Sequence, residues 1–450
     1  MAVLIVLGLL VGHMSRETRI SLDFETVSAE ELGDQLEFDS PLGVEDVETA
    51  EEMAFSLSEL PEVRDPLAAP QMLELQPDGA LTPSEIDVPQ IGLALTGREA
   101  GRRASLLGRY GGDGRTENAV DKGLDWLAQN QAKTGPDAGS WSLSGPFRDG
   151  VSRNYDNPVA ATAMALLAFQ GRGNTHKKGP YRENVAAGWR WLLEQQDGDG
   201  SFFHEGPMNH RFYTQGQCTI ALCELYGMTG DSRFLGPAEQ AVKYCLRSQS
   251  GEGGWKYVPA GRSDLSVTGW ILMGLQSARM AKIEVPEDCL QRVERFLDRV
   301  AAEDDASRYC YEPGKMPSRS MTAEGLLCRQ YLGWARDDPR LVEGVEWITQ
   351  PENLVNFDDG RDVYYWYYAT QVAHHMEGEY WQRWNRAMKQ VLPQQQVQRG
   401  REMGSWDPVN PTRDQWASYG GRLYVTCLSI YMLEVYYRHL PLYTKVYGGK

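Results

Sequence analysis

Six apolar, helix-like stretches recur along the chain, and each carries a threonine near its start. The stretches repeat roughly every fifty residues. Within each repeat a first helix-like segment leads into a Gly-rich or Pro-rich turn, and the threonine-bearing stretch follows the turn. A two-helix repeat of this length cannot bury its apolar face alone, so neighbouring repeats must stack on it. The recurring threonines are Thr162, Thr219, Thr268, Thr322, Thr370 and Thr426.

The turns inside the repeats share a second pattern, a glutamine followed by a glycine and an aromatic residue. A glycine permits the left-handed backbone that is needed just past a helix end, and a glutamine amide can satisfy the free backbone groups there. We interpret these turns as structural, with the aromatic ring fixing each turn to the next hairpin. The copies are Gln131 with Gly139-Ser140-Trp141, Gln196 to Phe202, Gln249 to Trp255, and the partial copy Gly404-Ser405-Trp406.

In these turns the chain resembles the α/α toroid shared by squalene and hopene cyclases and by the β subunits of protein prenyltransferases. The likeness covers about residues 116–445, although repeats four and five lack the turn motif. It implies an all-α fold, an α6/α6 toroid of six helical hairpins in which the threonine-bearing helices form the inner ring. In that family the ring encloses an apolar cavity for an isoprenoid chain, so an isoprenoid-like small molecule is the expected ligand. The inner helices would start near Pro158, Gln215, Asp264, Ser318, Tyr364 and Arg422.

The charge of the chain is concentrated ahead of the repeats. Residues 1–100 hold 21 acidic and 4 basic residues, a net charge of -17 that equals the charge of the whole chain. Residues 15–115 are rich in Glu, Asp, Pro and Ser, so we predict an acidic disordered linker. Such an acidic front end argues against nucleic acid as a partner, because phosphate binding needs basic patches.

Residues 1–14 are apolar but too short to span a bilayer, which needs about 20 apolar residues. Three interpretations stay open: a membrane anchor that begins upstream of Met1, an interfacial segment, or a hydrophobic terminus. The first would place the protein at a membrane through its N-terminus, and otherwise we expect it in the cytoplasm. The seven cysteines include no CxxC pair, and we predict buried free thiols and no structural zinc site.

Class II cyclases of the family begin by protonating an alkene or epoxide with the middle aspartate of a DxDDT motif. The matching segment here runs from Asp264 to Thr268, and its acid position is Ser266. Because a serine cannot protonate an alkene, the resemblance leaves the acid in doubt. Asp264 is then the catalytic candidate, although an aspartate at a helix start is more often an N-cap.

The metal chemistry of the resembling families is also incomplete. The prenyltransferase zinc histidine is replaced by Tyr365, and repeat four has no aspartate–cysteine pair, so we predict no zinc. Asp358, Asp359 and Asp362 match the DDxxD pattern that holds Mg²⁺ in other isoprenoid enzymes, but Gly360 interrupts it and we favour a chance match. His374 and His375 point to different faces of a helix, which favours core or surface positions.

Aromatic residues are the strongest remaining signal for a cavity. Five consecutive aromatics open inner helix five at Tyr364, and at most two of them can face the ring's interior. We predict a cavity and mouth lined by polar and aromatic residues at the starts of the inner helices, and packing between helices is the alternative. The candidates are Asp156, His210, Arg211, Tyr213, Ser266, Trp270, Arg319, Asp362, Tyr365, Trp366 and Arg422.

Two functions fit these observations. In the first, the chain is a cyclase-like protein that binds an isoprenoid or other apolar ligand and isomerises it with an altered acid. In the second, the ring has lost catalysis and serves as a scaffold for a ligand or a protein partner, tethered by the N-terminal tail. Fold alone does not decide between them.

Overall fold

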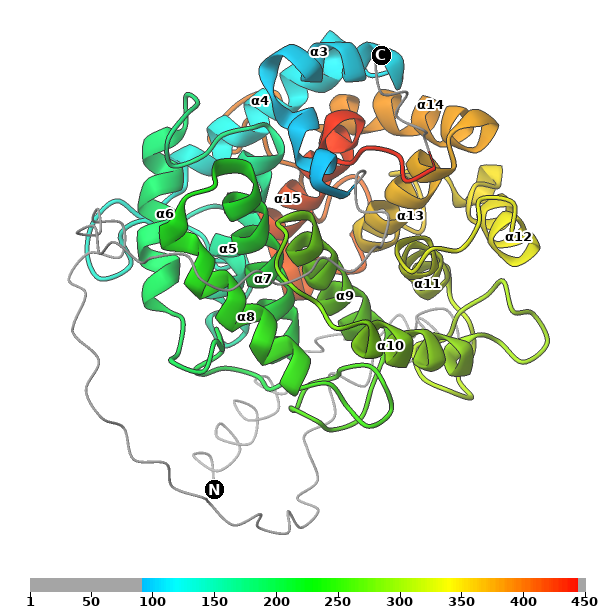
Figure 1. Cartoon of the computed structure of the whole chain (residues 1–450). Helices are drawn as coiled ribbons and strands as arrows, with labels where there is room; N and C mark the ends of the chain where they lie inside the picture. The colour runs from blue at the N-terminus through cyan, green and yellow to red at the C-terminus, as the bar shows by residue number, and fades with distance from the viewer. Residues whose placement is uncertain (1–90, 444–450) are drawn as a thin grey trace, which may run out of the picture.

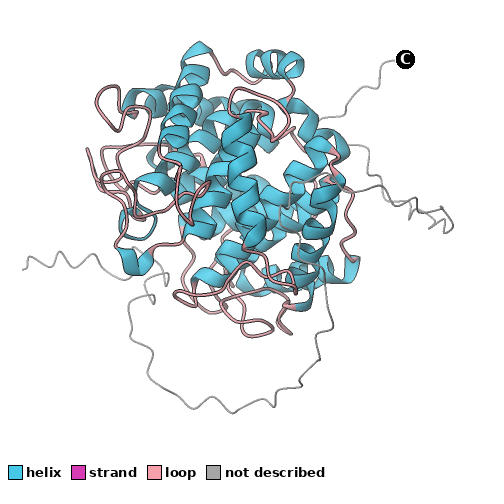
Figure 2. Ribbon diagram, turned by 90° about the vertical axis from the view of Figure 1, so that its left-hand side faces the viewer, coloured by secondary structure: helices cyan, strands magenta, loops and turns pink. Residues whose placement is uncertain are grey.

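The computed structural model describes residues 91–443, and within that range the chain is entirely helical, with no strand (Figure 2). Four short 3-10 helices accompany the α-helices: η2 (Ile91–Arg98), η3 (Arg153–Tyr155), η4 (Ser232–Phe234) and η5 (Pro351–Asn353). The α-helices are α3 (Ala100–Arg109), α4 (Gly114–Gln129), α5 (Pro158–Gly171), α6 (Arg182–Glu194), α7 (His210–Thr229), α8 (Leu235–Arg247), α9 (Leu265–Met280), α10 (Glu287–Val300), α11 (Arg319–Tyr331), α12 (Pro339–Ile348), α13 (Val363–Met376), α14 (Gly378–Gln395) and α15 (Ala417–Arg438).

Two sets of helices differ in how they are buried. Every residue of α13 is buried, and α5, α7, α9, α11 and α15 are buried along most of their length. The alternating helices, such as α10, bury one face only. A helix that is apolar all round belongs in an interior, whereas an amphipathic one lies at the surface. The first set therefore forms an inner layer and the second an outer layer.

The inner helices form a closed ring. Each packs against the next in the order α5, α7, α9, α11, α13 and α15, and α15 packs back against α5 (Figure 1). Outer helix α4 contacts both α15 and α5, so the first outer helix covers the seam between the last and first repeats. This arrangement confirms the predicted α6/α6 toroid.

The glutamine–glycine–aromatic turns join neighbouring outer helices. The side-chain amide of Gln249 donates to the carbonyls of Gly253 in its own turn (2.7 Å) and Cys289 in the next outer helix (3.0 Å). In the sixth repeat the amide of Gln396 makes the same two bonds, to Gly404 (2.8 Å) and to Ala119 of α4 (2.7 Å). The last turn therefore fixes the ring's closure, and the predicted structural role of these turns is confirmed.

Four of the six recurring threonines hold a turn of their own repeat from the inner side. All six are fully buried. In repeat two the N–H of Phe202 pairs with the Gln215 side chain (3.0 Å), and in repeat five Thr370 accepts from the indole of Trp384 (2.8 Å). In the other four repeats the threonine Oγ1 accepts the backbone N–H of the turn aromatic: Thr162 from Trp141, Thr268 from Trp255, Thr322 from Tyr309 and Thr426 from Trp406.

One end of the ring is sealed by residues that the sequence assigned to the linker. Within the predicted linker 15–115, residues 91–109 form η2 and α3, which pack against α15. Buried Arg98 reaches between the inner helices and pairs with Glu224 of α7 (2.7 Å). The described fold therefore begins earlier than residue 116, because Leu95 is buried and Arg98 bonds to buried groups of α7 and α15. The segments 1–14 and 15–90 lie outside the described residues.

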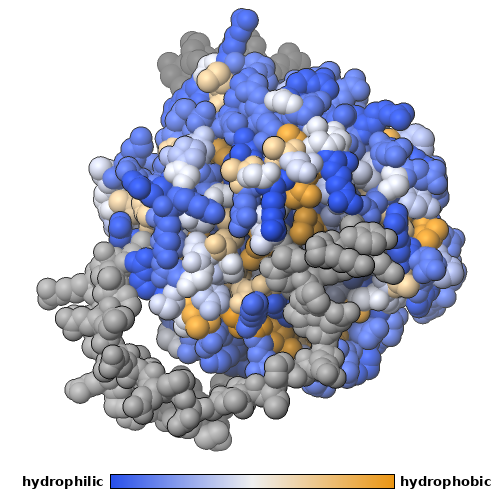
Figure 3. Space-filling model, turned by 45° about the horizontal axis from the view of Figure 1, so that its top comes forward, coloured by the Kyte–Doolittle hydropathy of each residue, from blue (hydrophilic) through white to orange (hydrophobic). Residues whose placement is uncertain are grey.

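The face that carries α3 is mainly hydrophilic, with hydrophobic residues visible only in small areas between polar ones (Figure 3). None of the helices within residues 91–443 is both long and apolar enough to cross a bilayer. All seven cysteines are buried free thiols, as predicted.

Candidate ligand pocket

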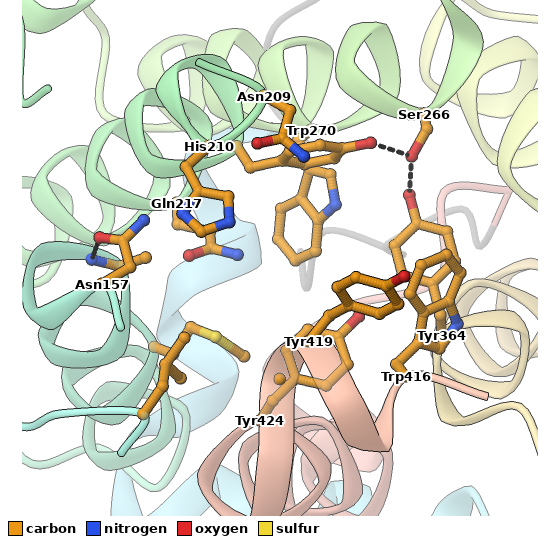
Figure 4. A pocket seen from close by; sticks show the side chains of 15 residues that line it. Asn157, Asn209, His210, Gln217, Ser266, Trp270, Tyr364, Trp416, Tyr419 and Tyr424 are labelled. Carbon is orange, nitrogen blue, oxygen red and sulfur yellow. Dashed lines mark hydrogen bonds between the residues drawn. The ribbon is translucent and has the colours of Figure 1, made fainter. Parts of the chain in front are cut away.

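A pocket of about 140 Å³ opens at the end of the ring where the inner helices begin (Figure 4). Asn157 caps α5, His210 is the first residue of α7, and Ser266 and Tyr364 lie in the first turns of α9 and α13. The start of α15 completes the wall. Most of the surface is aromatic or apolar, from Leu143, Ala160, Met164, Tyr213, Trp270, Tyr364, Trp416, Tyr419 and Tyr424.

A chain of hydroxyl groups forms one polar edge of this pocket. Tyr213 donates to Ser266 (2.8 Å), and the hydroxyls of Ser266 and Tyr364 lie 2.7 Å apart (Figure 4). Tyr364 in turn donates to Oε2 of Glu324 on α11 (3.0 Å). Glu324 is fully buried, and this burial raises the pKa of its carboxyl group well above the usual range. The polar edge of the pocket therefore ends in a buried carboxylic acid behind the wall.

The remaining polar groups of the pocket differ in how well they are paired. The Asn157 side chain is occupied, because it accepts from Ala160 N–H and donates to Thr214. Burial lowers the pKa of His210, so its imidazole is neutral at pH 7. Gln217 lines the pocket, and its Oε1 has no hydrogen-bond partner among the described residues.

Asp264, the catalytic candidate, lies behind the pocket wall. Its Oδ1 accepts Val267 N–H (2.7 Å), so the side chain is the N-cap of α9, and Oδ2 accepts the Tyr311 hydroxyl (2.8 Å). Burial raises the pKa of Asp264 to about 7, although the hydrogen bonds from Val267 and Tyr311 favour the ionised form and lower it. Both carboxylate oxygens are therefore occupied by structural partners, and the residue does not line the pocket.

The inner end of the pocket is formed by an aromatic layer. Trp270 stacks on Tyr367, with ring centroids 5.7 Å apart and planes 14° apart, and Tyr367 contacts Tyr431 at 5.8 Å. Beyond this layer lies a second cavity of about 20 Å³, lined by Glu224, Arg438 and His439 among others. The aromatic layer therefore divides the bore, and of these two spaces the one at the helix starts is the larger.

Four of the predicted site residues line the pocket: His210, Tyr213, Ser266 and Trp270. Tyr365 and Trp366 lie outside it, because one residue of helix rotates a side chain by about 100° and Tyr364 already faces the interior. Tyr365 donates to Ile348 of outer helix α12, and Trp366 packs on Phe357.

The charged candidates have structural partners in the loops around the pocket. Asp156 accepts from Ser142 and from the backbone of Leu143, and Asp362 caps α13. The guanidinium of Arg211 lies over the ring of Phe203. The two other arginines behave similarly: Arg319 lies over the ring of Tyr365, and Arg422 pairs with Asp149 and Asp407.

The acidic motif before α13 does not converge on one point. Asp358 and Asp359 are exposed, whereas the Asp362 carboxylate is buried and bonded to Ser320, Trp416 and Tyr365 N–H. Within residues 91–443 no three His, Cys, Asp or Glu side chains are grouped so that they could hold a metal ion. His374 and His375 are buried in the core, in agreement with the sequence prediction.

Sequence reasoning did not single out Glu324, Gln217, Trp416 or Tyr419. Glu324 stands among small and apolar residues of an inner helix, and an isolated acid in such a stretch is a signal that could have found it. Gln217 lies among other polar residues at the start of α7, so the sequence gives no comparable signal for it. Helix α15 starts at Ala417, five residues before the predicted start at Arg422, and it kinks at Gly421. Trp416 and Tyr419 were missed because both lie ahead of the predicted start.

No family model matches the chain. Human lanosterol synthase is 26% identical over 148 residues, which make up 30% of this chain and 20% of the enzyme. The chain therefore matches about a fifth of the length of this relative. The chain has a terpene cyclase-like α/α toroid fold.

Solved structures of similar shape include enzymes of different chemistry. The α-1,6-mannanase GH76A of Salegentibacter sp. HEL1_6 aligns with a TM-score of 0.49 at 10% identity, over 71% of this chain and 98% of the enzyme. The type II terpene cyclase MstE from Scytonema, in complex with geranylgeranyl dihydroxybenzoate, aligns with a TM-score of 0.45 at 14% identity, over 72% of this chain and 97% of the cyclase.

Proposed function

We propose that this terpene cyclase-like toroid binds an isoprenoid-like apolar ligand and holds a ring-sized part of it in the pocket at the inner-helix starts. The observation that carries the proposal is the aromatic-walled space of about 140 Å³ between Met164, Trp270 and Tyr424. An apolar protein cavity of about 150 Å³ accommodates benzene. Pockets for whole drug-sized ligands are larger, about 300–1,000 Å³. The buried part of the ligand is therefore about one six-membered ring in size.

The positions of the acids favour binding over cyclisation. Protonation of an alkene requires an acid within reach of the bound carbon. The described residues that line the pocket include no carboxylic acid, and Asp264 and Glu324 are held behind the wall by other side chains. Aromatic faces around the space supply dispersion contacts and affinity for apolar groups.

Methylcyclohexane is a suitable first probe, because it fills the pocket and makes no hydrogen bond. We expect one molecule to bind per chain by isothermal titration calorimetry. Ala160 of α5 lines the pocket, so Ala160→Phe places a ring in the space that the probe needs. Met164→Trp, one turn further along α5, is a second way to fill it. The matched control is Ala186→Phe on outer helix α6, where the side chain is half-buried and outside the pocket.

The expected result is binding to the wild type and to Ala186→Phe, and at least tenfold weaker binding to whichever filled variant retains a cooperative thermal transition. Equal binding to the wild type and to the filled variants, or no binding to the wild type, would overturn the proposal. In either case a scaffold role, with protein partners bound elsewhere, would become the better hypothesis. Mass spectrometry of an organic extract of the purified wild type then identifies any native ligand.

A further inference from the structure

The first and last outer helices form a groove whose charged residues are all basic. Helices α4 and α14 pack against each other at the seam of the ring, and a hollow of about 300 Å³ lies along them. We call this hollow the seam groove. Its charged lining residues are Arg115 and Lys122 of α4 and Lys389 of α14, and no aspartate or glutamate lines it.

The two lysines of the seam groove donate to neutral oxygens. Lys122 Nζ donates to the Gln398 side chain (2.8 Å), and Lys389 Nζ donates to the Gly111 carbonyl (2.9 Å). Neither lysine forms an ion pair with a carboxylate among the described residues. Arg386 is exposed one turn before Lys389 in α14 and adds positive charge to the same side of that helix. The groove therefore keeps positive charge that nothing in the described fold neutralises.

The acidic residues of α4 lie on a different face from Lys122. Glu117, Asp121 and Asp125 follow one another at intervals of four residues, so they share one face of the helix. Glu117 and Asp121 pair with Arg172 at the end of α5, and Asp125 accepts a tyrosine hydroxyl just before α6. These three carboxylates are therefore used on the side of α4 that faces the first repeat, away from α14.

The complementary charge lies in the same chain. Residues 23–62, the acidic segment, hold 14 acidic residues and no lysine or arginine. Residues 63–90 connect this segment to Ile91, where the described fold begins, and 28 extended residues reach about 90 Å. A domain of about 350 residues is roughly 50 Å across, so the acidic segment can reach any face of the fold. Because it belongs to the same chain, its effective concentration at the groove exceeds that of a free partner.

We propose that the acidic segment docks on the seam groove of its own chain, with its carboxylates paired to Lys122 and Lys389. A lysine ammonium is a compact point charge, so several carboxylates of the segment can take the same place. Each exposed ion pair contributes little by itself and is screened by salt. The docking therefore depends on several pairs together. It lies on the outer surface and is independent of the ligand pocket.

Carbodiimide cross-linking of the full-length protein tests the docking, because the reagent joins a lysine amine to a carboxylate only where the two groups meet. Trypsin cuts after Arg19 and Arg64, so all 14 acidic residues fall in one peptide, residues 20–64. We expect mass spectrometry to find this peptide joined to Lys122 and Lys389. The yield should fall about tenfold in 1 M NaCl, where the screening length is about 3 Å.

The matched control is Lys282, an exposed lysine directly after α9. Helix α9 packs against η2, where the described chain begins, so the tether alone would favour Lys282. We expect the 20–64 peptide about fivefold less often on Lys282 than on the groove lysines. Lys122→Gln removes one charge from the groove and should lower the yield at Lys389 about two- to fivefold, whereas Lys282→Gln should leave it unchanged. Thermal unfolding of each variant shows that it is folded before yields are compared.

Mixing 15N-labelled and unlabelled chains shows whether the two joined peptides come from one molecule, and we expect them to. Equal yields on Lys122, Lys389 and Lys282, or an unchanged yield at Lys389 in Lys122→Gln, would overturn the proposal. So would the absence of the 20–64 peptide from the groove lysines, which would leave the groove to a separate acidic partner. Joined peptides from two different molecules would also overturn it and would assign the groove to the tail of a second copy.

Discussion

The Oγ1 atom of Thr268 lies 3.0 Å from the backbone nitrogen of Trp255 and accepts its hydrogen bond. The Trp255 indole in turn donates to the Cys245 carbonyl on outer helix α8 (2.8 Å). One threonine of the inner ring thereby holds the turn whose aromatic ring is anchored to the outer ring. The threonine periodicity of the sequence is therefore a structural pattern that links the two layers of the toroid.

Replacing Thr268 with valine keeps the shape but leaves the Trp255 N–H buried without a partner. We expect Thr268→Val to lower the free energy of unfolding by about 1–3 kcal/mol, measured by urea denaturation. The matched control is Thr219→Val, since the corresponding N–H of Phe202 pairs with Gln215 instead. Thr219→Val should cost clearly less, and equal losses in the two variants would contradict this role for the threonine.

Gly404 allows the last turn to close the ring. Its φ is 95°, and a Cβ atom there would clash with the carbonyl oxygen of Lys122 on α4. We expect Gly404→Ala to lower the melting temperature by several degrees, because both the backbone and the packing against α4 are strained. Gly251→Ala is the control, at a turn glycine with open space around it. A melting temperature for Gly404→Ala equal to that of Gly251→Ala would argue against this closure.

Asp264 makes stability depend on pH. Its folded pKa of about 7 lies above the ordinary value of 3.8, so the folded chain holds a proton that the unfolded chain loses between pH 4 and 7. The bound proton therefore contributes to the free energy of unfolding. This contribution is fully present below pH 4 and is lost as the pH rises through 7, and its size is at most about 4 kcal/mol. Asp264→Asn keeps the N-cap and has no carboxyl group to titrate. Its stability relative to wild type should therefore rise as the pH increases from 4 to 7.

The control for this pH experiment is Asp113→Asn at the N-cap of α4. Partial burial raises the pKa of Asp113, but hydrogen bonds from Arg115 and Thr116 outweigh it and the net shift is downward. Asp113→Asn should therefore lose stability relative to wild type as the pH rises through about 4, the opposite sign. Urea denaturation at pH 3, 4.5, 6 and 8 covers both changes, since that of Asp113 lies at the acidic end and that of Asp264 between pH 4 and 7. A flat difference between Asp264→Asn and wild type would contradict the raised pKa.

Glu224 joins the sealed end of the ring through two buried arginines. It pairs with Arg98 (2.7 Å) and Arg438 (3.2 Å), so Glu224→Gln leaves their charges inadequately paired. We expect a loss of about 3–5 kcal/mol in the free energy of unfolding at pH 7. Burial raises the pKa of the neighbouring Glu434 to about 8, against Arg438 and Arg98, so this residue is largely protonated at pH 7. Glu434→Gln should therefore cost less, and the reverse order would contradict these charge assignments.

The sequence predicted the fold well because the toroid is built from a repeated local pattern. Each glutamine, glycine and threonine makes the same contacts in several repeats, so one residue pattern reports on the whole ring. The helix start at Pro158 and the N-caps Asp264 and Ser318 follow from local rules, and the structure agrees. Helix α7 starts at His210, five residues before the predicted start at Gln215. The prediction missed this start because no side-chain cap marks it: Asn209 precedes the helix but makes no capping hydrogen bond.

The pocket was harder to predict because it depends on which side of each inner helix faces the bore. The inner helices are apolar all round, so periodicity does not tell Tyr364, which lines the pocket, from Tyr365, which packs outward. The link between Ser266 and Glu324 spans α9, α13 and α11, and no local pattern brings these residues together. The sealing role of Arg98 likewise depends on a partner 126 residues away.

We propose above all that the ring holds an apolar, ring-sized ligand at the starts of its inner helices. Iodobenzene tests it directly, because iodine can be located by anomalous diffraction in a crystal soaked with the compound. We predict one dominant anomalous peak inside the pocket, between Met164, Trp270 and Tyr424. An empty pocket, or iodine bound only at other sites on the molecule, would contradict the account.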